Sequence, residues 1–179
     1  MTVADERVRC GWANDLLLAA YHDQEWGVWP VSDAAAFEML SLEVFQAGLA
    51  WSTILRKRAG FRRAFHGFDV DRVAALGAAD VARLLEDATI VRHRGKIAAT
   101  IANARAVQAM QAEHGSLRAY LRSLPADPDL AHPVLRRRLT FFGPTTCRSF
   151  FEATGIVAPA HEPTCWLAGI TPPLPHSGE

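Results

Sequence analysis

The sequence predicts an all-α fold in a single domain that spans residues 1–179. Apolar residues recur at helical spacing in several segments, and serine, aspartate or glycine marks many of the segment ends. No convincing run alternates apolar and polar residues with the two-residue period of a strand. With 179 residues, of which 50% are hydrophobic and 21% charged, the chain can bury one substantial core, and its length favours one domain over two.

The first two expected helices cover residues 32–48 and 51–65. In the first, Ser32 or Asp33 caps the amino end, apolar residues follow at helical spacing, and Gly48 stops the helix. The second helix follows after a short turn. The prediction is therefore a pair of helices joined at Gly48.

The middle of the chain predicts two short helices and one long helix. The short helices, 69–76 and 78–88, lie on either side of Gly77. The alanine-rich segment 95–115 favours one long helix that ends at Gly115, because alanine is the strongest helix former and glycine a common helix stop.

The last third of the chain predicts three more helices and two irregular segments. Residues 116–123 form a helix, residues 124–129 form a loop, and the last two helices flank residues 141–146. Residues 158–175 hold too much proline and too little apolar periodicity for a helix or a strand.

Cellular location and disulfides follow from simple features of the sequence. The first twelve residues hold acids and no apolar run, and nowhere do about eighteen uncharged apolar residues follow one another. The sequence therefore predicts neither a signal peptide nor a membrane span, and a cytoplasmic location. The three cysteines are too few for a disulfide framework and indicate metal binding or packing.

The formal net charge is zero, but the basic residues are unevenly distributed. The windows 52–66, 88–111 and 130–151 hold most of them and contain no acid. If these windows share a face, that face suits a phosphate backbone, and Arg94 and Lys96 are candidate DNA contacts. Solvated helix faces on different sides of the molecule explain the charge pattern equally well.

A histidine and a cysteine in the proline-rich segment, His161 and Cys165, are spaced so that both can reach one metal ion. Structural zinc takes four ligands, so another pair must come from elsewhere. Cys10 and His22 complete a Cys2His2 set that would fasten this segment to the start of the chain, and Cys147 remains a small buried hydrophobe. Spacing alone favours the alternative of unrelated histidines and cysteines, since the long separation matches no common zinc finger.

Glu43 is the second feature with chemical potential, because apolar residues surround it on its predicted helix. Burial of an unpaired carboxylate costs several kcal/mol. Glu43 is therefore either paired with an arginine, at the boundary of the core, or a ligand-facing acid in a pocket. Trp12, Tyr21, Trp26 and Trp51 flank it in sequence and suit a flat cationic ligand, although tryptophan is also a common core residue.

A third feature is the turn at Gly143 and Pro144, which leads into a helix that begins with Thr145 and Thr146. The first turn of a helix presents unpaired backbone N–H groups and the positive end of a dipole, and so favours an anion. The arrangement resembles a helix-hairpin-helix motif, which holds a DNA phosphate. Taken alone, Gly-Pro-Thr is a common helix start.

Taken together, these segments resemble a known family. The stretches "RCGW", "YHDQEWGV", "LEVFQAGLAWSTILRKR", "IVRHRGKIAATIANARA", "FFGPTTCRSFFEATG" and "HEPTC" occur in the order found in the bacterial DNA-3-methyladenine glycosylase I family. The resemblance runs from about Arg9 to Cys165. It implies a helix-hairpin-helix DNA glycosylase-like fold and an enzyme that flips 3-methyladenine out of alkylated double-stranded DNA and hydrolyses its glycosidic bond.

The resemblance also implies roles for individual residues. One structural zinc ion per chain would join the terminal segments, the base pocket would include the catalytic residue, and a short loop would intercalate into DNA. A monomer is the default assembly. The implied residues are Cys10, His22, His161 and Cys165 for zinc; Glu43, Tyr21 and Trp51, with Trp12 and Trp26 nearby, for the base; Glu43 as the catalytic residue; and Gly48 and Leu49 for the loop.

Some positions differ from the family pattern. The spacing from Cys10 to His22 is one residue shorter, Leu18 stands where tyrosine is usual, and the segment before the hairpin is shortened. No aspartate follows Asp129, although helix-hairpin-helix glycosylases that act on neutral lesions generally rely on one beyond the hairpin. The alternatives are therefore a non-catalytic zinc-stapled DNA-binding module and a glycosylase of shifted lesion specificity.

Overall fold

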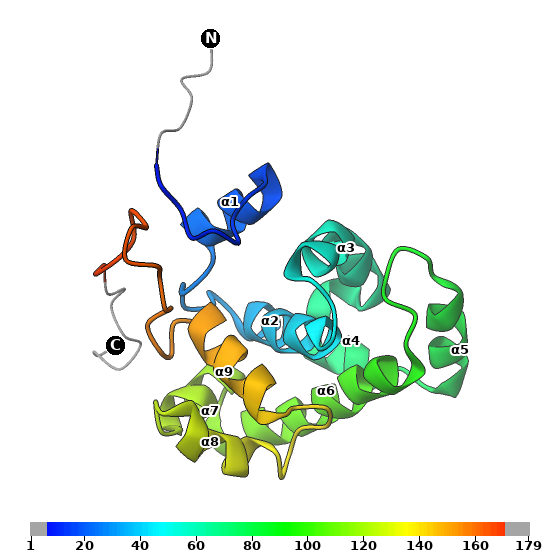
Figure 1. Ribbon diagram of the computed structural model, residues 1–179. Helices are drawn as coiled ribbons and strands as arrows, with labels where there is room; N and C mark the ends of the chain where they lie inside the picture. Colours follow the sequence, from blue (N-terminus) through cyan, green and yellow to red (C-terminus); the bar gives the residue numbers. More distant parts are fainter. Residues whose placement is uncertain (1–6, 171–179) are drawn as a thin grey trace.

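A computed structural model describes residues 7–170 and confirms the all-α prediction, with no strand in that range. Figure 1 shows the helices gathered around a central helix, α2. The helical elements are α1 (Leu16–Gln24), α2 (Asp33–Gln46), α3 (Trp51–Ala64), the 3-10 turn η1 (His66–Phe68), α4 (Val70–Ala74), α5 (Ala78–Glu86), α6 (Arg94–His114), α7 (Leu117–Ser123), α8 (Pro128–Leu135) and α9 (Pro144–Ala153).

Helix α2 forms the centre of the core. Ser32 caps it, since its side chain accepts a hydrogen bond from the backbone N–H of Ala35. Every residue from Ala36 to Phe45 is buried, because α3, α4, α6, α7 and α9 all pack against this helix. As a result, its two glutamates, Glu38 and Glu43, lie inside the protein.

Helix α1 was not expected from the sequence. Asp15 caps it by accepting a hydrogen bond from the N–H of Leu18. Its buried side chains are Leu18, Tyr21 and His22, which share one face of the helix but are not all apolar, so the sequence lacks the usual apolar stripe. Leu18 and Tyr21 join the hydrophobic core.

Helix α8 begins inside the segment expected to be a loop over residues 124–129. Asp127 caps it and Pro128 occupies its first turn, where a missing N–H and a fixed φ favour proline. The prolines that indicated a loop therefore mark a helix start. The other predicted helices begin and end within a few residues of the expected positions.

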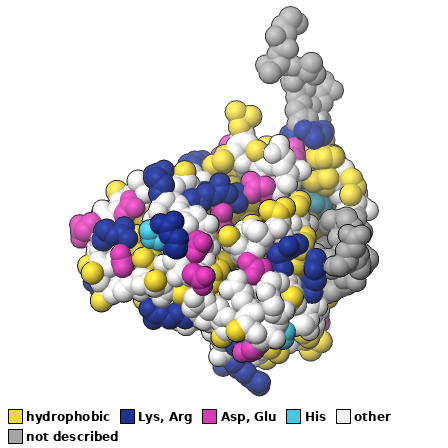
Figure 2. Space-filling model, turned by 180° about the vertical axis from the view of Figure 1, so that it is seen from behind, with side chains coloured by type: hydrophobic (Ala, Val, Ile, Leu, Met, Phe, Trp, Pro, Cys, Tyr) yellow, Lys and Arg dark blue, Asp and Glu magenta, His cyan; other side chains and the backbone are white. Residues whose placement is uncertain are grey.

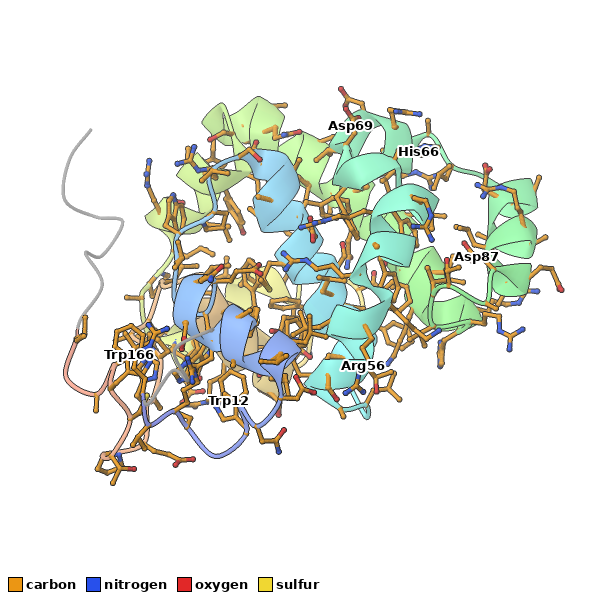
Figure 3. All side chains as sticks on the ribbon, turned by 90° about the horizontal axis from the view of Figure 1, so that it is seen from above. Trp12, Arg56, His66, Asp69, Asp87 and Trp166 are labelled. Atoms are coloured by element: carbon orange, nitrogen blue, oxygen red, sulfur yellow. The ribbon has the colours of Figure 1, made fainter. Side chains whose placement is uncertain are left out.

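The two terminal segments lie side by side (Figure 1). The N–H of Trp166 donates to the carbonyl of Val8 over 2.8 Å, and the N–H of Gly11 donates to the Glu162 carboxylate over 2.9 Å. Figure 3 shows Trp12 and Trp166 at the same end of the molecule. Between residues 7 and 170, no helix combines the length and the apolar character needed to cross a membrane.

Candidate active site and metal centre

A cavity of about 590 Å³ lies where α1, α2, α3 and α9 meet. All five residues that the sequence analysis placed in a base pocket line it: Trp12, Tyr21, Trp26, Glu43 and Trp51. Their segments pack together because α2 contacts both α3 and α9, and α1 contacts α3. The volume is that of a small-molecule site.

The aromatic rings form a continuous wall of the cavity. The ring centroids of Tyr21 and Trp51 are 5.2 Å apart, and those of Trp12 and Trp26 are 5.1 Å apart with the rings nearly perpendicular. Trp12 and Tyr21 join the two pairs at 6.3 Å. The Nε1 atom of Trp51 is buried without a hydrogen-bond partner. These π faces suit a planar ligand.

Glu43 is the buried acid of this cavity, with 5% of its surface exposed. Within residues 7–170 its side chain has no hydrogen-bond or ion-pair partner. Two arginines of α3 pair instead with Glu38, which accepts hydrogen bonds from Arg58 Nε at 2.5 Å and from Arg62 Nε at 3.0 Å. Burial, and secondly the charge of Glu152, raise the pKa of Glu43 to about 8. Glu43 is therefore available to a ligand.

Several other residues that line the cavity were not identified from the sequence. Helix α9, which follows the turn at Gly143 and Pro144, contributes Ser149 and Glu152. The remaining polar lining comes from Asn14, Gln46 and Ser52. No local pattern marks these residues, because they meet only through the packing of distant helices.

The loop between α2 and α3 lies beside the cavity, since Gln46 and Ala50 line it. Gly48 adopts a φ of +79°, a conformation that favours glycine. Leu49 is 37% exposed, and its carbonyl accepts a hydrogen bond from the Gln46 side chain over 3.0 Å. The loop thus presents an apolar side chain next to the mouth of the cavity.

Lys96 is buried, with 7% of its surface exposed, and its ammonium contacts the backbone where α2 leads into this loop. Its ammonium donates to the carbonyls of Phe45 at 2.8 Å and Ala47 at 2.6 Å. A cation at a helix carboxyl end satisfies unpaired carbonyls and complements the helix dipole. A direct contact of Lys96 with DNA does not fit this geometry, whereas Arg94 is exposed in the first turn of α6.

Several arginines of the basic windows bind partners within the protein. The windows therefore carry less free positive charge than the sequence suggests. Figure 2 shows basic and acidic side chains interspersed on the back of the molecule. The internally paired arginines are Arg56 with Asp15, Arg58 and Arg62 with Glu38, Arg105 with the carbonyls of Ala74 and Leu76, Arg138 with Glu113, and Arg148 with Asp129.

The turn between α8 and α9 is held in a fixed shape. Asn103 is fully buried and makes two hydrogen bonds to Thr140, one from its amide to the carbonyl and one from the Thr140 N–H to its oxygen. Gly143 caps α9 without a side-chain hydrogen bond. Thr145 is exposed and Thr146 is half-buried, so the first turn of α9 remains accessible.

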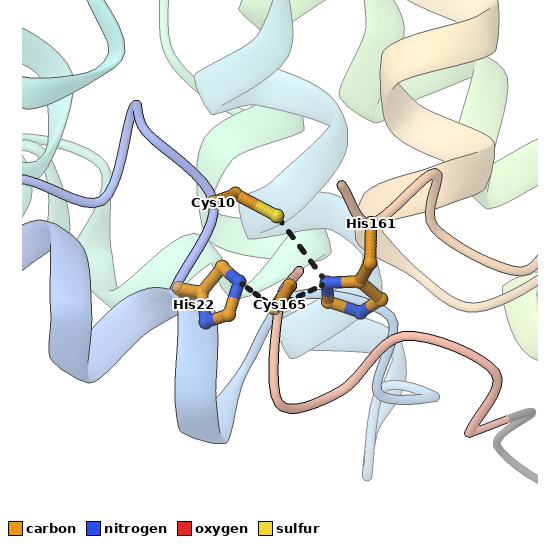
Figure 4. A group of neighbouring side chains, drawn as sticks. All are labelled: Cys10, His22, His161 and Cys165. Carbon is orange, nitrogen blue, oxygen red and sulfur yellow. Dashed lines mark hydrogen bonds between the residues drawn. The ribbon is translucent and has the colours of Figure 1, made fainter. Parts of the chain in front are cut away.

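Cys10, His22, His161 and Cys165 converge at the terminal segments, with one ligand atom of each within 4.8 Å of the others (Figure 4). The Sγ atom of Cys165 lies 3.4 Å from His22 Nε2 and 3.6 Å from His161 Nδ1. Three of the four residues are buried. Two sulfur and two imidazole donors at these distances can hold a metal ion.

The surroundings of this cluster orient its members. The other ring nitrogen of His22, Nδ1, lies 2.8 Å from the carboxylate of Asp23. Asp23 in turn accepts hydrogen bonds from Arg9 and from the indole of Trp166. Metal-ligating histidines are commonly oriented by such a carboxylate.

Comparison with known proteins gives concordant matches. The family model described as methyladenine glycosylase matches residues 12–133. DNA-3-methyladenine glycosylase 1 of Escherichia coli (strain K12) is 41% identical over 170 residues, covering 83% of this chain and 91% of that protein. DNA-3-methyladenine glycosylase of Haemophilus influenzae is 32% identical, with coverage of 83% and 92%.

Solved structures match in the same way. A crystal structure of 3-methyladenine DNA glycosylase I has a TM-score of 0.82 and 40% identity, and the match covers 89% of this chain and 98% of that chain. A structure on 3-methyladenine recognition by the Staphylococcus aureus enzyme has a TM-score of 0.77 and 27% identity, with coverage of 93% and 94%. The similarity thus extends over nearly the whole described chain.

Proposed function

This chain belongs to the methyladenine glycosylase family, and from that membership we propose that it removes 3-methyladenine from alkylated double-stranded DNA in base excision repair. One observation carries the proposal: a buried carboxylate without a partner faces a cavity walled by tryptophan and tyrosine rings. Such a cavity attracts a flat, positively charged ligand, and a 3-methylated adenine in DNA is one. The reaction is hydrolysis of the N-glycosidic bond.

Base recognition falls to Glu43 and the aromatic wall. Glu43 hydrogen-bonds the edge of the flipped base and complements its charge, while Tyr21 and Trp51 stack on its faces. Trp12 and Trp26 close the remaining side. Adenine in normal DNA is neutral, so it gains less from this carboxylate than the methylated base does.

Bond cleavage needs little help from an acid, because the methylated base is already positively charged and therefore a good leaving group. The electron pair of the C1′–N9 bond goes to the base, which departs neutral. A water oxygen bonds to C1′ and releases its proton to solvent. The protein contributes by flipping, selecting and positioning the nucleotide, so Glu43 acts as a catalytic residue through its contact with the base.

Contact with DNA involves two surfaces beside the cavity. Leu49, next to Gly48, fills the gap that the flipped nucleotide leaves, and Lys96 holds the loop that carries it. The backbone N–H groups after Gly143, with Thr145 and Thr146, bind a phosphate in the manner of a helix-hairpin-helix motif. Arg94 adds positive charge near the backbone. We propose that the protein acts as a monomer in the cytoplasm.

The DNA contacts lead to a prediction about Leu49→Gly. The variant is expected to lose at least tenfold in excision from duplex DNA, because stacking lost on base flipping costs a few kcal/mol that the leucine partly replaces. Excision from single-stranded DNA is the matched control, since no partner strand must be separated there. Equal loss on both substrates, or full activity on duplex, would contradict a wedge role.

A second prediction concerns salt. If phosphate contacts dominate, the logarithm of the affinity for undamaged duplex should fall linearly with the logarithm of the salt concentration and vary little with sequence. Fluorescence anisotropy with two unrelated duplexes measures both. An affinity that does not change with salt would contradict the proposed contacts.

The four-residue cluster fits zinc. Its donors are two thiols and two imidazoles, the set that structural zinc sites use, and the His22–Asp23 pair provides the orienting carboxylate. We propose one zinc ion per chain, held by Cys10, His22, His161 and Cys165. Four protein ligands leave no position for a reactive water, so this zinc would hold the terminal segments together rather than take part in hydrolysis.

The test of the proposed function is base release from methylated duplex DNA. The protein is expected to liberate 3-methyladenine in multiple turnovers, measured by chromatography of the released base. Binding of duplex DNA without release of any base would instead identify a non-catalytic DNA-binding module. Release of a different methylated base in preference to 3-methyladenine would identify a shifted specificity.

A further inference from the structure

The cavity holds a second carboxylate, Glu152, which the proposed function does not use. It comes from the last turn of α9, whereas Glu43 comes from α2, and these two helices pack against each other. Both side chains line the same space. Two acids from different helices therefore face one site.

Neither acid is neutralised by a nearby cation. Within residues 7–170, the carboxylate of Glu152 makes no hydrogen bond or ion pair, and the same holds for the carboxylate of Glu43. Arg148 lies close enough to act on Glu152 electrostatically, but its guanidinium binds Asp129 at 2.9 Å. Burial of two unpaired carboxylates is unfavourable unless a positive partner arrives. The arrangement is complementary to a cation that enters the cavity.

The two acids also differ in depth. Glu43 is buried, with 5% of its surface exposed, whereas Glu152 is half-buried. A base that remains attached to DNA enters with its far edge deep and its sugar at the mouth. Glu43 therefore meets the inner edge of the base, and Glu152 lies nearer the outer part, where the positive charge of the ring is also felt.

We propose that Glu152 is a second specificity-determining carboxylate of the base pocket, which acts together with Glu43 to select positively charged purines over neutral ones. The inference rests on the proposed function. A single carboxylate attracts a cation, and a second carboxylate at the same site strengthens that attraction. It also makes the site less favourable in free energy when it is empty or holds a neutral base.

The pair also influences its own ionisation. Burial first, and then the charge of Glu152, raise the pKa of Glu43 to about 8. Burial raises the pKa of Glu152, while Arg148 lowers it. The other titratable group that interacts with Glu43 is Tyr21 on α1, whose pKa is raised by burial and then by Glu43. Removal of the Glu152 charge should therefore let Glu43 ionise at lower pH.

The test compares Glu152→Gln with Glu86→Gln, a variant with the same charge change at an exposed glutamate of α5 outside the cavity. In wild type, kcat/KM for 3-methyladenine in DNA should rise with pH to a plateau, with a midpoint near 8 that reflects Glu43. Glu152→Gln should lower the plateau about tenfold and move the midpoint to lower pH. Excision of neutral hypoxanthine should not fall.

One further variant, Glu152→Asp, completes the design. Glu152→Asp keeps the charge and should retain most of the preference for the cationic lesion, even if Glu152→Gln folds poorly. Loss of that preference in Glu152→Asp, or a plateau and midpoint in Glu152→Gln that equal those of wild type and Glu86→Gln, would overturn the inference. A wild-type protein that releases no 3-methyladenine would instead overturn the proposed function itself.

Discussion

Replacement of Glu43 by glutamine is expected to lower 3-methyladenine excision about a hundredfold and, near neutral pH, to make the protein more stable. The loss of activity follows because glutamine cannot ionise. A cationic base that enters the cavity favours the charged form of Glu43, and glutamine offers no such charge. Glutamine keeps the size and one acceptor of glutamate, so the cavity should keep its shape. Function and stability therefore change in opposite directions.

The gain in stability follows from the pKa of Glu43. Burial and the charge of Glu152 raise that pKa from its ordinary value of 4.5 to about 8. Between these values the unfolded chain has an ionised Glu43 while the folded protein must keep it protonated, so the folded protein loses stability as pH rises. The loss is about 3 kcal/mol at pH 7 and at most about 5 kcal/mol above pH 8.

Glu43→Gln should accordingly match wild type in unfolding free energy below about pH 4.5 and exceed it increasingly up to about pH 8. Urea unfolding across this range measures the difference. The matched control is Glu38→Gln on the same helix. It removes the carboxylate that Arg58 and Arg62 share but leaves Arg58 its ion pair with Glu25, so it should destabilise the protein by about 1–3 kcal/mol. Stabilisation by both variants, or by neither, would contradict this account of the helix.

The predicted loss of activity in Glu43→Gln can be compared with a second variant and with a neutral lesion. Trp51→Phe keeps an aromatic ring and trims only stacking area, so it should lose less activity than Glu43→Gln. Hypoxanthine is a neutral lesion and should be removed slowly by wild type. Rapid removal of hypoxanthine, or excision of 3-methyladenine by Glu43→Gln at the wild-type rate, would show that charge recognition is not the basis of catalysis.

The pair of glutamates on α2 illustrates what sequence can predict. The sequence indicates that Glu43 lies among apolar residues, and the structure places it there. It does not indicate that the arginines of α3 reach Glu38 rather than Glu43, because that choice depends on how α3 crosses α2. Pairing between helices is a property of packing, whereas burial along one helix follows from its own periodicity.

The helices likewise divide into those that a local sequence pattern predicts and those that it does not. Helix α2 follows from periodic apolar residues and a capped start, and α6 from its alanine content and a glycine stop. Helix α1 escaped notice because it buries Tyr21 and His22, which belong to the cavity and to the cysteine–histidine cluster. Local signals weaken where the buried face of a helix includes polar residues that belong to a site.

The candidate DNA surface was the least predictable part. A run of basic residues indicates positive charge, but it does not tell which charges remain free after folding. Lys96 binds backbone carbonyls beneath the Gly48 loop, and Arg105 binds carbonyls of the α4 end. Glu152 was missed for the converse reason, since its position in the cavity depends on the contact between α9 and α2.

Removal of the proposed zinc is expected to have the second large effect, on both stability and activity. The metal would join segments near the two chain ends, which are otherwise connected by few hydrogen bonds. Zinc binding by a Cys2His2 set contributes about 10–16 kcal/mol in isolated fingers. Even a fraction of that free energy would dominate the stability of these segments, so Cys165→Ala should abolish zinc binding and markedly lower the melting temperature.

The activity should fall as well, because the cluster supports one wall of the base cavity. The ring of Trp26 lies 4.7 Å from that of His161, and the ring of Trp12 lies 5.3 Å from that of His22. Release of the terminal segments would therefore free the two tryptophans that close the cavity. Trp51 and Glu43 lie on α3 and α2, so the opposite wall should remain in place.

The matched control for Cys165→Ala is Cys147→Ala, which removes a fully buried thiol outside the cluster. Cys147→Ala should lose some packing energy and keep about one zinc per chain, whereas Cys165→Ala should keep none. Metal analysis by mass spectrometry, thermal unfolding and base release on the same preparations separate the effects. If Cys165→Ala retains zinc, or loses zinc without a change in melting temperature, the cluster does not fasten the two terminal segments. The wall formed by Trp12 and Trp26 must then be stabilised by protein contacts alone.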